Sequence, residues 1–230
     1  MIKFLISLTI YVGLLILIRP APASLKSAPI SFSENFKLVW ASMLSGIFIM
    51  FFFLMTTRFG FDIVDGNMYR MLTMCNNANL IFERPLQIFT HLFIHGNIAH
   101  LSANVVGLGL ASAYERRVGA NRYFEVLFVG CLACIPSILF YSGNITVCGI
   151  SGGVFGLAAA YFTDEDKLTA KEWFITILIF LFLLTLLTLD GIFKSRHNED
   201  LKLKIDHLGH FFGAAGAIIY CRLNPQRLVK

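Results

Sequence analysis

Charged residues are scarce in this sequence. They make up 14% of its 230 residues, against about 25% in a typical soluble domain, whereas hydrophobic residues make up 57%. The charges that are present lie in groups between long apolar runs, a pattern typical of bilayer-spanning helices joined by short loops. The composition therefore argues against a water-soluble fold and predicts a polytopic membrane helix bundle of the all-α class.

Acidic residues are scarcer than basic ones, so the net charge is +5. In a soluble chain such an excess would favour binding to nucleic acid. Here the basic residues flank apolar segments, so we interpret them as topology signals. We expect the lipid bilayer, and not nucleic acid, as the surrounding partner.

Cysteine is also rare, with five residues. Cys131 and Cys134 form a C-x-x-C spacing inside an apolar run rather than beside a βαβ pattern, so we interpret them as small packing residues and not as a redox pair. The sequence leaves open whether Cys75 pairs with Cys148.

Internal repeats and low-complexity tracts are missing, so the apolar runs alone divide the chain. Residues 1–37 are predicted to form an N-terminal hydrophobic helix and a cytoplasmic linker. A signal peptide is the alternative, but no small-x-small cleavage site precedes Arg19 and Pro20, which favours a retained helix. The core is expected at residues 38–222 and a basic cytoplasmic tail at 223–230. Six core spans are predicted, at about residues 38–55, 86–114, 123–141, 149–163, 173–189 and 208–221.

Lys and Arg are unevenly distributed between alternate loops. The loops that hold Arg116, Arg117 and the C-terminal tail belong to the richer set, so this side is predicted to be cytoplasmic. Asp164 and Glu165 make one of these loops acidic, but acidic residues contribute little to the rule. We therefore expect a multi-pass protein of the bacterial inner membrane with its C-terminus in the cytoplasm.

Polar residues inside the predicted spans are energetically costly, so each is a functional candidate. The candidates are His100, Asn104, Ser151 and His210. Counted from the cytoplasmic charged residues at 1.5 Å per residue, the last three lie about 16 to 20 Å from the inner boundary. In a hydrocarbon core about 30 Å thick, this depth is about 10 Å below the outer surface. We expect one site that opens to the outer face.

These residue types suit nucleophilic catalysis. A helix that begins at Ser151 would point free backbone N–H groups at an oxyanion. His210, followed by Gly213 on a closely packed helix, would bring an imidazole within reach of the Ser151 hydroxyl and activate it. Asn104 and His100, four residues apart on one helix face, would donate hydrogen bonds to the oxyanion.

Three motifs occur in order: His91-x-x-x-His95-x-x-x-x-His100-x-x-x-Asn104, Gly149-Ile150-Ser151-Gly152 and Asp206-x-x-x-His210-x-x-Gly213. In order and spacing they resemble the rhomboid intramembrane serine proteases. The resemblance implies a six-helix core, here with an extra N-terminal transmembrane helix, that cleaves transmembrane segments of substrate proteins near the outer face. It also implies a Ser–His dyad without an acidic third member. We expect no cofactor.

The resemblance assigns roles to residues of this chain. Ser151 would be the nucleophile and His210 the general base and acid, with an acyl-enzyme intermediate. The oxyanion site would comprise Asn104, His100 and the backbone N–H of Ser151. Structural support would come from His95, Gly149, Phe155 and Gly213.

Some positions depart from the family pattern or compete within it. Leu86 and Gln87 stand where the family often carries Trp-Arg, which leaves the anchoring of the first outer loop open. Phe155 stands where a Tyr often stacks on the catalytic histidine, so an aromatic ring is kept and its hydroxyl is not. His207 competes as the base; we prefer His210 because its neighbours then fall in the family's places.

Three rival interpretations remain. His91 and His95 are expected to anchor a loop; a zinc site is the alternative, but Leu92 replaces the Glu of H-E-x-x-H, and we expect no metal. A catalytically silent rhomboid-like protein that binds and steers membrane-protein clients is disfavoured, because Ser151 and His210 are both present. A transporter or channel is disfavoured, because paired broken helices in two related halves are missing from the sequence pattern. The oligomeric state stays open.

Overall fold

The computed structural model describes residues 1–19, 30–76, 83–141, 145–164 and 206–225, together with eight helical positions between 170 and 185. The chain divides into two compact units, one of Met1–Leu72 with Phe93–Glu125 and one of Thr73–Leu92 with Val126–Lys230. Helices dominate both units, and the strands among the described residues are the two-residue β1 (Met74–Cys75) and β2 (Thr146–Val147). The predicted all-α class is confirmed.

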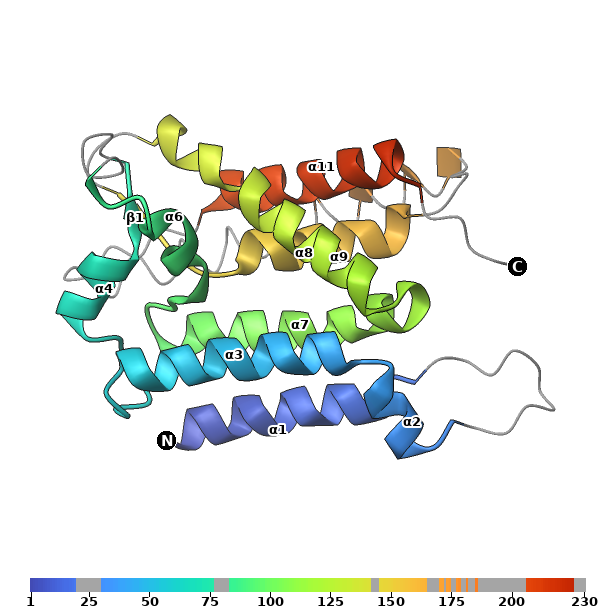
Figure 1. Cartoon of the computed structure of the whole chain (residues 1–230), viewed down its shortest axis with the longest axis horizontal. Helices are drawn as coiled ribbons and strands as arrows, with labels where there is room; N and C mark the ends of the chain where they lie inside the picture. Colours follow the sequence, from blue (N-terminus) through green and yellow to red (C-terminus); the bar gives the residue numbers. More distant parts are fainter. Residues whose placement is uncertain are drawn as a thin grey trace. The chain divides into compact units, whose positions relative to one another are not determined.

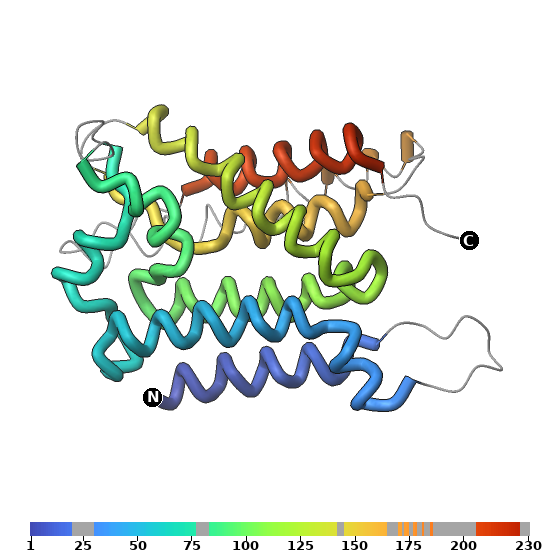
Figure 2. Tube along the Cα trace, viewed as in Figure 1, coloured from blue at the N-terminus to red at the C-terminus, as the bar shows by residue number. Residues whose placement is uncertain are grey.

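The first unit is built on three long helices, α1 (Ile2–Leu17), α3 (Trp40–Thr56) and α7 (Ile98–Val118). Figures 1 and 2 show them running side by side. The shorter α2 (Phe32–Lys37) and α4 (Gly66–Leu72) flank α3, and the first residues of α8 (Ala120–Ala133) complete the unit.

Polar contacts fix α1 against its neighbours. Ser7 shares a hydrogen bond with Ser102 of α7, and the Tyr11 hydroxyl donates to the Ser42 carbonyl of α3 at 2.5 Å. A Cβ added to Gly46 would lie 2.3 Å from the Tyr11 hydroxyl oxygen. Glycine is therefore needed at position 46 for the Tyr11 ring to pack against α3. The helix therefore packs as a structural element of the unit.

The end of α7 that is predicted to be cytoplasmic carries two charged residues, Glu115 and Arg116, whose side chains form hydrogen bonds with the ends of other helices. The Glu115 carboxylate is buried and accepts from the backbone N–H groups of Ala41 at 2.8 Å and Ser42 at 2.7 Å. These groups open α3, whose N-cap residue makes no side-chain cap. Arg116 donates to the Asn35 side chain at 2.8 Å and to the Leu15 carbonyl at 2.8 Å, which closes the end of α1.

Two predicted helices have different bounds in the structure. The helix predicted at 86–114 begins only at Ile98, because the extended Asn97 accepts from the His100 N–H at 2.9 Å and caps it. Two short turns precede it, α6 (Gln87–Thr90) and the 3-10 helix η1 (His91–Phe93). The helix predicted at 123–141 ends at Ala133, and a 3-10 helix, η2 (Ile135–Phe140), follows with a proline in its first turn.

The other predicted helices agree more closely with the structure. Those expected from residues 2, 38, 149 and 208 begin at Ile2, Trp40, Ser151 and His207. The helix expected at 173–189 lies largely outside the described residues, so the predicted number of core helices stays a prediction.

The second unit contains the remaining elements. Helices α9 (Ser151–Thr163) and α11 (His207–Leu223) pack along each other, and β1 pairs with β2 in antiparallel register, Met74 opposite Val147. Cys75 and Cys148 are free thiols.

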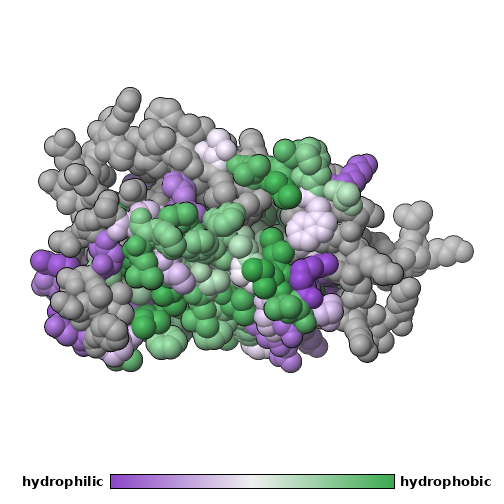
Figure 3. Space-filling view, turned by 90° about the horizontal axis from the view of Figure 1, so that it is seen from above, coloured by the Kyte–Doolittle hydropathy of each residue, from purple (hydrophilic) through white to green (hydrophobic). Residues whose placement is uncertain are grey.

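Apolar side chains remain widely exposed. Phe128 is 53%, Phe211 49% and Ile219 58% exposed on helices of the second unit, values that suit contact with lipid rather than water. Figure 3 shows a continuous group of apolar residues on the surface that it displays. Within the described part of the chain, one helical stretch, Ala120–Phe140, is long and apolar enough to cross a membrane by length and composition.

The cap that Glu115 provides gives a first prediction. Glu115→Ala leaves two buried N–H groups at the start of α3 without their acceptor, which should lower the free energy of unfolding by about 2 kcal/mol or more. Glu125→Ala is the control, because Glu125 is half exposed and pairs with Arg122 at 3.4 Å, a contact worth at most about 1 kcal/mol. Thermal unfolding in mild detergent measures both. Equal losses would contradict the capping role.

Candidate active site

A sharp turn delivers Ser151 to the start of α9. Gly149 adopts a φ of 101°, a conformation that residues with a Cβ rarely accept. Its backbone N–H donates to the His91 carbonyl at 2.8 Å, which holds the chain in place two residues before the serine. Ser151 therefore enters the first turn of α9, where backbone N–H groups lack helical partners.

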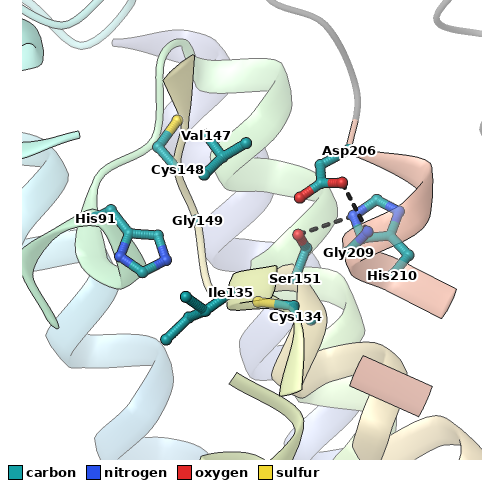
Figure 4. A pocket seen from close by; sticks show the side chains of 11 residues that line it. His91, Cys134, Ile135, Val147, Cys148, Gly149, Ser151, Asp206, Gly209 and His210 are labelled. Atoms are coloured by element: carbon teal, nitrogen blue, oxygen red, sulfur yellow. Dashed lines mark hydrogen bonds between the residues drawn. The ribbon is translucent and has the colours of Figure 1, made fainter. Parts of the chain in front are cut away.

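His210 approaches the serine from the first turn of α11. Its Nε2 lies 2.8 Å from Ser151 Oγ, and Figure 4 shows the two side chains pointing toward each other. The imidazole is buried, with 6% of its residue surface exposed. Such a distance is what proton transfer from a serine hydroxyl to an imidazole requires.

Glycines set the distance between the two helices. A Cβ added to Gly213 would lie 2.3 Å from the Gly152 carbonyl oxygen, so the backbones of α11 and α9 meet directly at this point. A Cβ added to Gly152 would in turn lie 2.7 Å from the Cys134 sulfur. Cys134 is a buried free thiol, in keeping with its interpretation as a packing residue.

An aromatic ring fixes the orientation of the imidazole. Phe155, one turn after Ser151, stacks on His210 with ring centroids 4.4 Å apart and an interplanar angle of 12°. The stacking expected at this position is present without a phenolic hydroxyl. The rival base, His207, lies edge-on to His210 with centroids 6.3 Å apart. The hydrogen bond that the structure records at Ser151 Oγ involves His210.

A small cavity of about 20 Å³ adjoins the serine, large enough for about one water molecule. Polar groups at its wall come from His91, Ser151, Asp206 and His210. The His91 imidazole donates through Nδ1 to the Gln87 carbonyl at 2.7 Å, as loop anchoring requires. Burial lowers the pKa of His91, so the neutral ring is favoured.

The remaining predicted residues belong to the first unit. His95 is fully buried and donates through Nδ1 to the Phe93 carbonyl at 3.2 Å, and its ring lies 4.9 Å from that of His100. Asn104 is 3% exposed and donates to the His100 carbonyl at 3.3 Å. The structure thus groups His95, His100 and Asn104 in one unit. It groups Gly149, Ser151, Phe155, His210 and Gly213 in the other.

Among the residues that the structure describes, no group of three or more His, Cys, Asp and Glu side chains converges on a point where a metal ion could bind.

A comparison with protein-family models finds the Rhomboid domain at residues 83–226, more than half of the chain. The chain belongs to the rhomboid family. It is accordingly an integral membrane protein. Rhomboids are typically intramembrane serine proteases, and the family also has inactive members. No curated protein matches the chain.

In this rhomboid, the two residues that replace Trp-Arg behave differently. Leu86 is 73% exposed, whereas Gln87 is 4% exposed and gives its carbonyl to His91. The segment that ends at Gln87 is thus tied to the site through the backbone of Gln87 and the ring of His91. A sequence motif does not reveal this contact, because the acceptor is a backbone carbonyl, which every residue carries.

Asp206 was predicted only as the first residue of a motif. Ser137 and Tyr141 were not predicted to belong to the site. The three are joined by hydrogen bonds beside the dyad. A carboxylate four residues before the histidine, at the start of an apolar run, was the available signal.

The close approach at Gly213 gives a second prediction. Gly213→Ala forces α9 and α11 apart, which should cost about 1–3 kcal/mol of stability and separate Ser151 from His210. Gly156→Ala is the milder comparison in the same helix pair, because its Cβ would lie 3.2 Å from the Ala217 Cβ and the Gly130 Cα and 3.3 Å from the Gly213 carbonyl oxygen. Both effects should therefore be smaller in this variant. Reaction of Ser151 with a serine-directed probe and the thermal midpoint measure both effects. Wild-type reactivity in Gly213→Ala would contradict the role of the glycine.

Proposed function

We propose that this rhomboid is an active intramembrane serine endopeptidase that cleaves transmembrane segments of membrane proteins, with Ser151 as nucleophile and His210 as general base and acid. The observation that carries the proposal is the 2.8 Å hydrogen bond between Ser151 Oγ and His210 Nε2. The stacked ring of Phe155 supports it, because it leaves the imidazole few other orientations.

The reaction begins when a substrate helix unwinds and presents a carbonyl carbon to Ser151. Oγ attacks this carbon while its proton passes to His210 Nε2. The protonated imidazole then gives the proton to the leaving amine as the peptide bond breaks, which leaves an acyl-enzyme. Water, deprotonated by the same nitrogen, attacks the ester and releases the new carboxyl terminus and the serine hydroxyl.

The negative charge that develops on the substrate carbonyl oxygen in the tetrahedral intermediate needs hydrogen-bond donors. The start of α9 offers the Ser151 backbone N–H, and the helix dipole favours negative charge there. We assign the remaining donors to Asn104 and His100, which occupy the oxyanion positions of the family motif and lie one turn apart on α7. Preorganised donors of this kind stabilise the tetrahedral intermediate more than the substrate.

The membrane arrangement is part of the proposal. We propose a six-helix catalytic core at residues 38–222, preceded by a transmembrane helix and linker at 1–37 and followed by a cytoplasmic tail at 223–230. The packing of α1 against α3 and α7 supports its place as a structural helix. The uneven distribution of Lys and Arg between alternate loops supports a cytoplasmic C-terminus and a site that opens to the outer face. We propose the bacterial inner membrane as its location.

Labelling with a fluorophosphonate probe tests the dyad without a known substrate. Purified protein in mild detergent should label, Ser151→Ala should abolish the labelling, and His210→Ala should lower its rate by a factor of about a thousand or more. His207→Ala should keep near wild-type labelling. A well-folded wild type that does not label would favour a silent, client-binding rhomboid. Loss in His207→Ala alone would make His207 the base.

The oxyanion assignment has its own test. Asn104→Ala should lower cleavage of a transmembrane substrate by about a hundredfold to a thousandfold, because one donor to the transition state is lost. Asn67→Ala, on the exposed helix α4, is the control and should leave cleavage unchanged. Equal activities of the two variants would remove Asn104 from the oxyanion site. Full cleavage by Ser151→Ala would refute the whole mechanism.

A further inference from the structure

The carboxylate of Asp206 accepts three hydrogen bonds next to the dyad. Asp206 is the N-cap residue of α11, four residues before His210. Its Oδ1 accepts from the Gly209 backbone N–H at 2.6 Å and from the Tyr141 hydroxyl at 2.8 Å. Its Oδ2 accepts from the Ser137 hydroxyl at 2.6 Å. One side chain therefore joins the first turn of α11 to a separate segment of the chain.

The partners of Asp206 belong to a well-packed region. Ser137 lies in η2 and is 1% exposed, and Tyr141 is the residue that ends η2. The Tyr141 carbonyl in turn accepts from the Asn76 side chain at 2.9 Å, next to β1. The carboxylate thus holds the start of α11 against a segment that is itself anchored.

The local sequence is shaped around this contact. A Cβ added to Gly209 would lie 2.2 Å from Asp206 Oδ2, so any larger residue here would push the carboxylate out of its present position. The Asp206 backbone carbonyl also accepts from the His210 N–H at 3.1 Å, which closes the first helical turn. Figure 4 shows Asp206 beside His210 and Ser151, in the wall of the same cavity.

We propose that Asp206 is a positioning residue for His210: by capping α11 and binding Ser137 and Tyr141, its carboxylate places the imidazole at hydrogen-bond distance from Ser151. The proposal rests on the proposed function for its catalytic consequence. It does not make Asp206 a third catalytic residue, because its action passes through the first turn of α11. A shift of about 1 Å in such a turn can lower a reaction rate about a hundredfold.

The primary test does not depend on activity. Protein carrying ¹⁵N-histidine is studied by NMR in detergent, with the His210 ring signal assigned by its loss in His210→Gln. Ser151→Ala supplies the signal of an imidazole whose hydrogen bond to Ser151 is missing. Asp206→Ala should move the wild-type Nε2 signal to the position seen in Ser151→Ala. Asp206→Asn, which keeps one acceptor oxygen for the Gly209 N–H, should move it less.

A matched control separates positioning from general loss of a helix cap. Asp65 caps α4 by accepting from the backbone N–H groups of Asn67 at 3.1 Å and Met68 at 3.2 Å. Asp65→Ala should lower the thermal midpoint and leave the His210 signal unchanged. Ser137→Ala and Tyr141→Phe each remove one donor and should move the signal partway, so the proposal remains testable if Asp206→Ala does not fold.

Labelling by the fluorophosphonate probe gives the second readout. Asp206→Ala should label between about tenfold and a hundredfold more slowly than wild type, with Asp206→Asn restoring part of the rate and Asp65→Ala at the wild-type rate. An unchanged His210 signal in Asp206→Ala, Ser137→Ala and Tyr141→Phe would overturn the inference. Failure of the wild type to label would overturn the proposed function and leave the NMR result to decide the inference alone.

Discussion

The direct contact between the backbones of α9 and α11 determines the geometry of the site. In a membrane protein the hydrophobic effect supplies little attraction between helices that face lipid, because lipid is as apolar as the helix surface. Association then depends on close packing, and small residues allow it. Gly213 lies against the backbone of Gly152, and this contact brings the first turns of the two helices together. Ser151 and His210 occupy these turns, so the packing of the helix pair and the formation of the dyad have the same cause.

Two carboxylates, the buried Glu115 and the partly buried Asp206, solve a related problem, one in each unit. The first N–H groups of a helix lack partners, and an apolar environment makes this costly. Glu115 supplies acceptors to the start of α3, and Asp206 supplies one to the start of its own helix. An anion at a helix N-terminus is also favoured by the dipole. Each carboxylate also joins two segments of the chain. Glu115 joins α7 to α3, and Asp206 joins α11 to the segment that holds Ser137 and Tyr141.

The sequence allowed much of this to be predicted where a physical rule was local. The starts of α3, α9 and α11 follow from apolar runs, and glycines beside Ser151 and His210 indicated close packing. The start of α7 was predicted wrongly, because Asn97 caps the helix inside a stretch whose apolar residues continue in both directions. The bonds from Ser137 and Tyr141 to Asp206 join residues more than sixty positions apart, so no periodicity reports them.

Membership of the rhomboid family leaves two possibilities, a protease or an inactive relative, and the residues around the serine help to choose between them. Gly149 has a positive φ that residues with a side chain rarely adopt, and Gly213 has no side chain where α11 meets the backbone of Gly152. The Phe155 ring stacks on one face of the imidazole. Each feature restricts the chain, and each serves the position of either Ser151 or His210. A protein that only binds clients would need neither a fixed imidazole nor a hydroxyl within its reach. All three features position the two partners of the hydrogen bond between Ser151 and His210, and this favours the protease over the inactive relative.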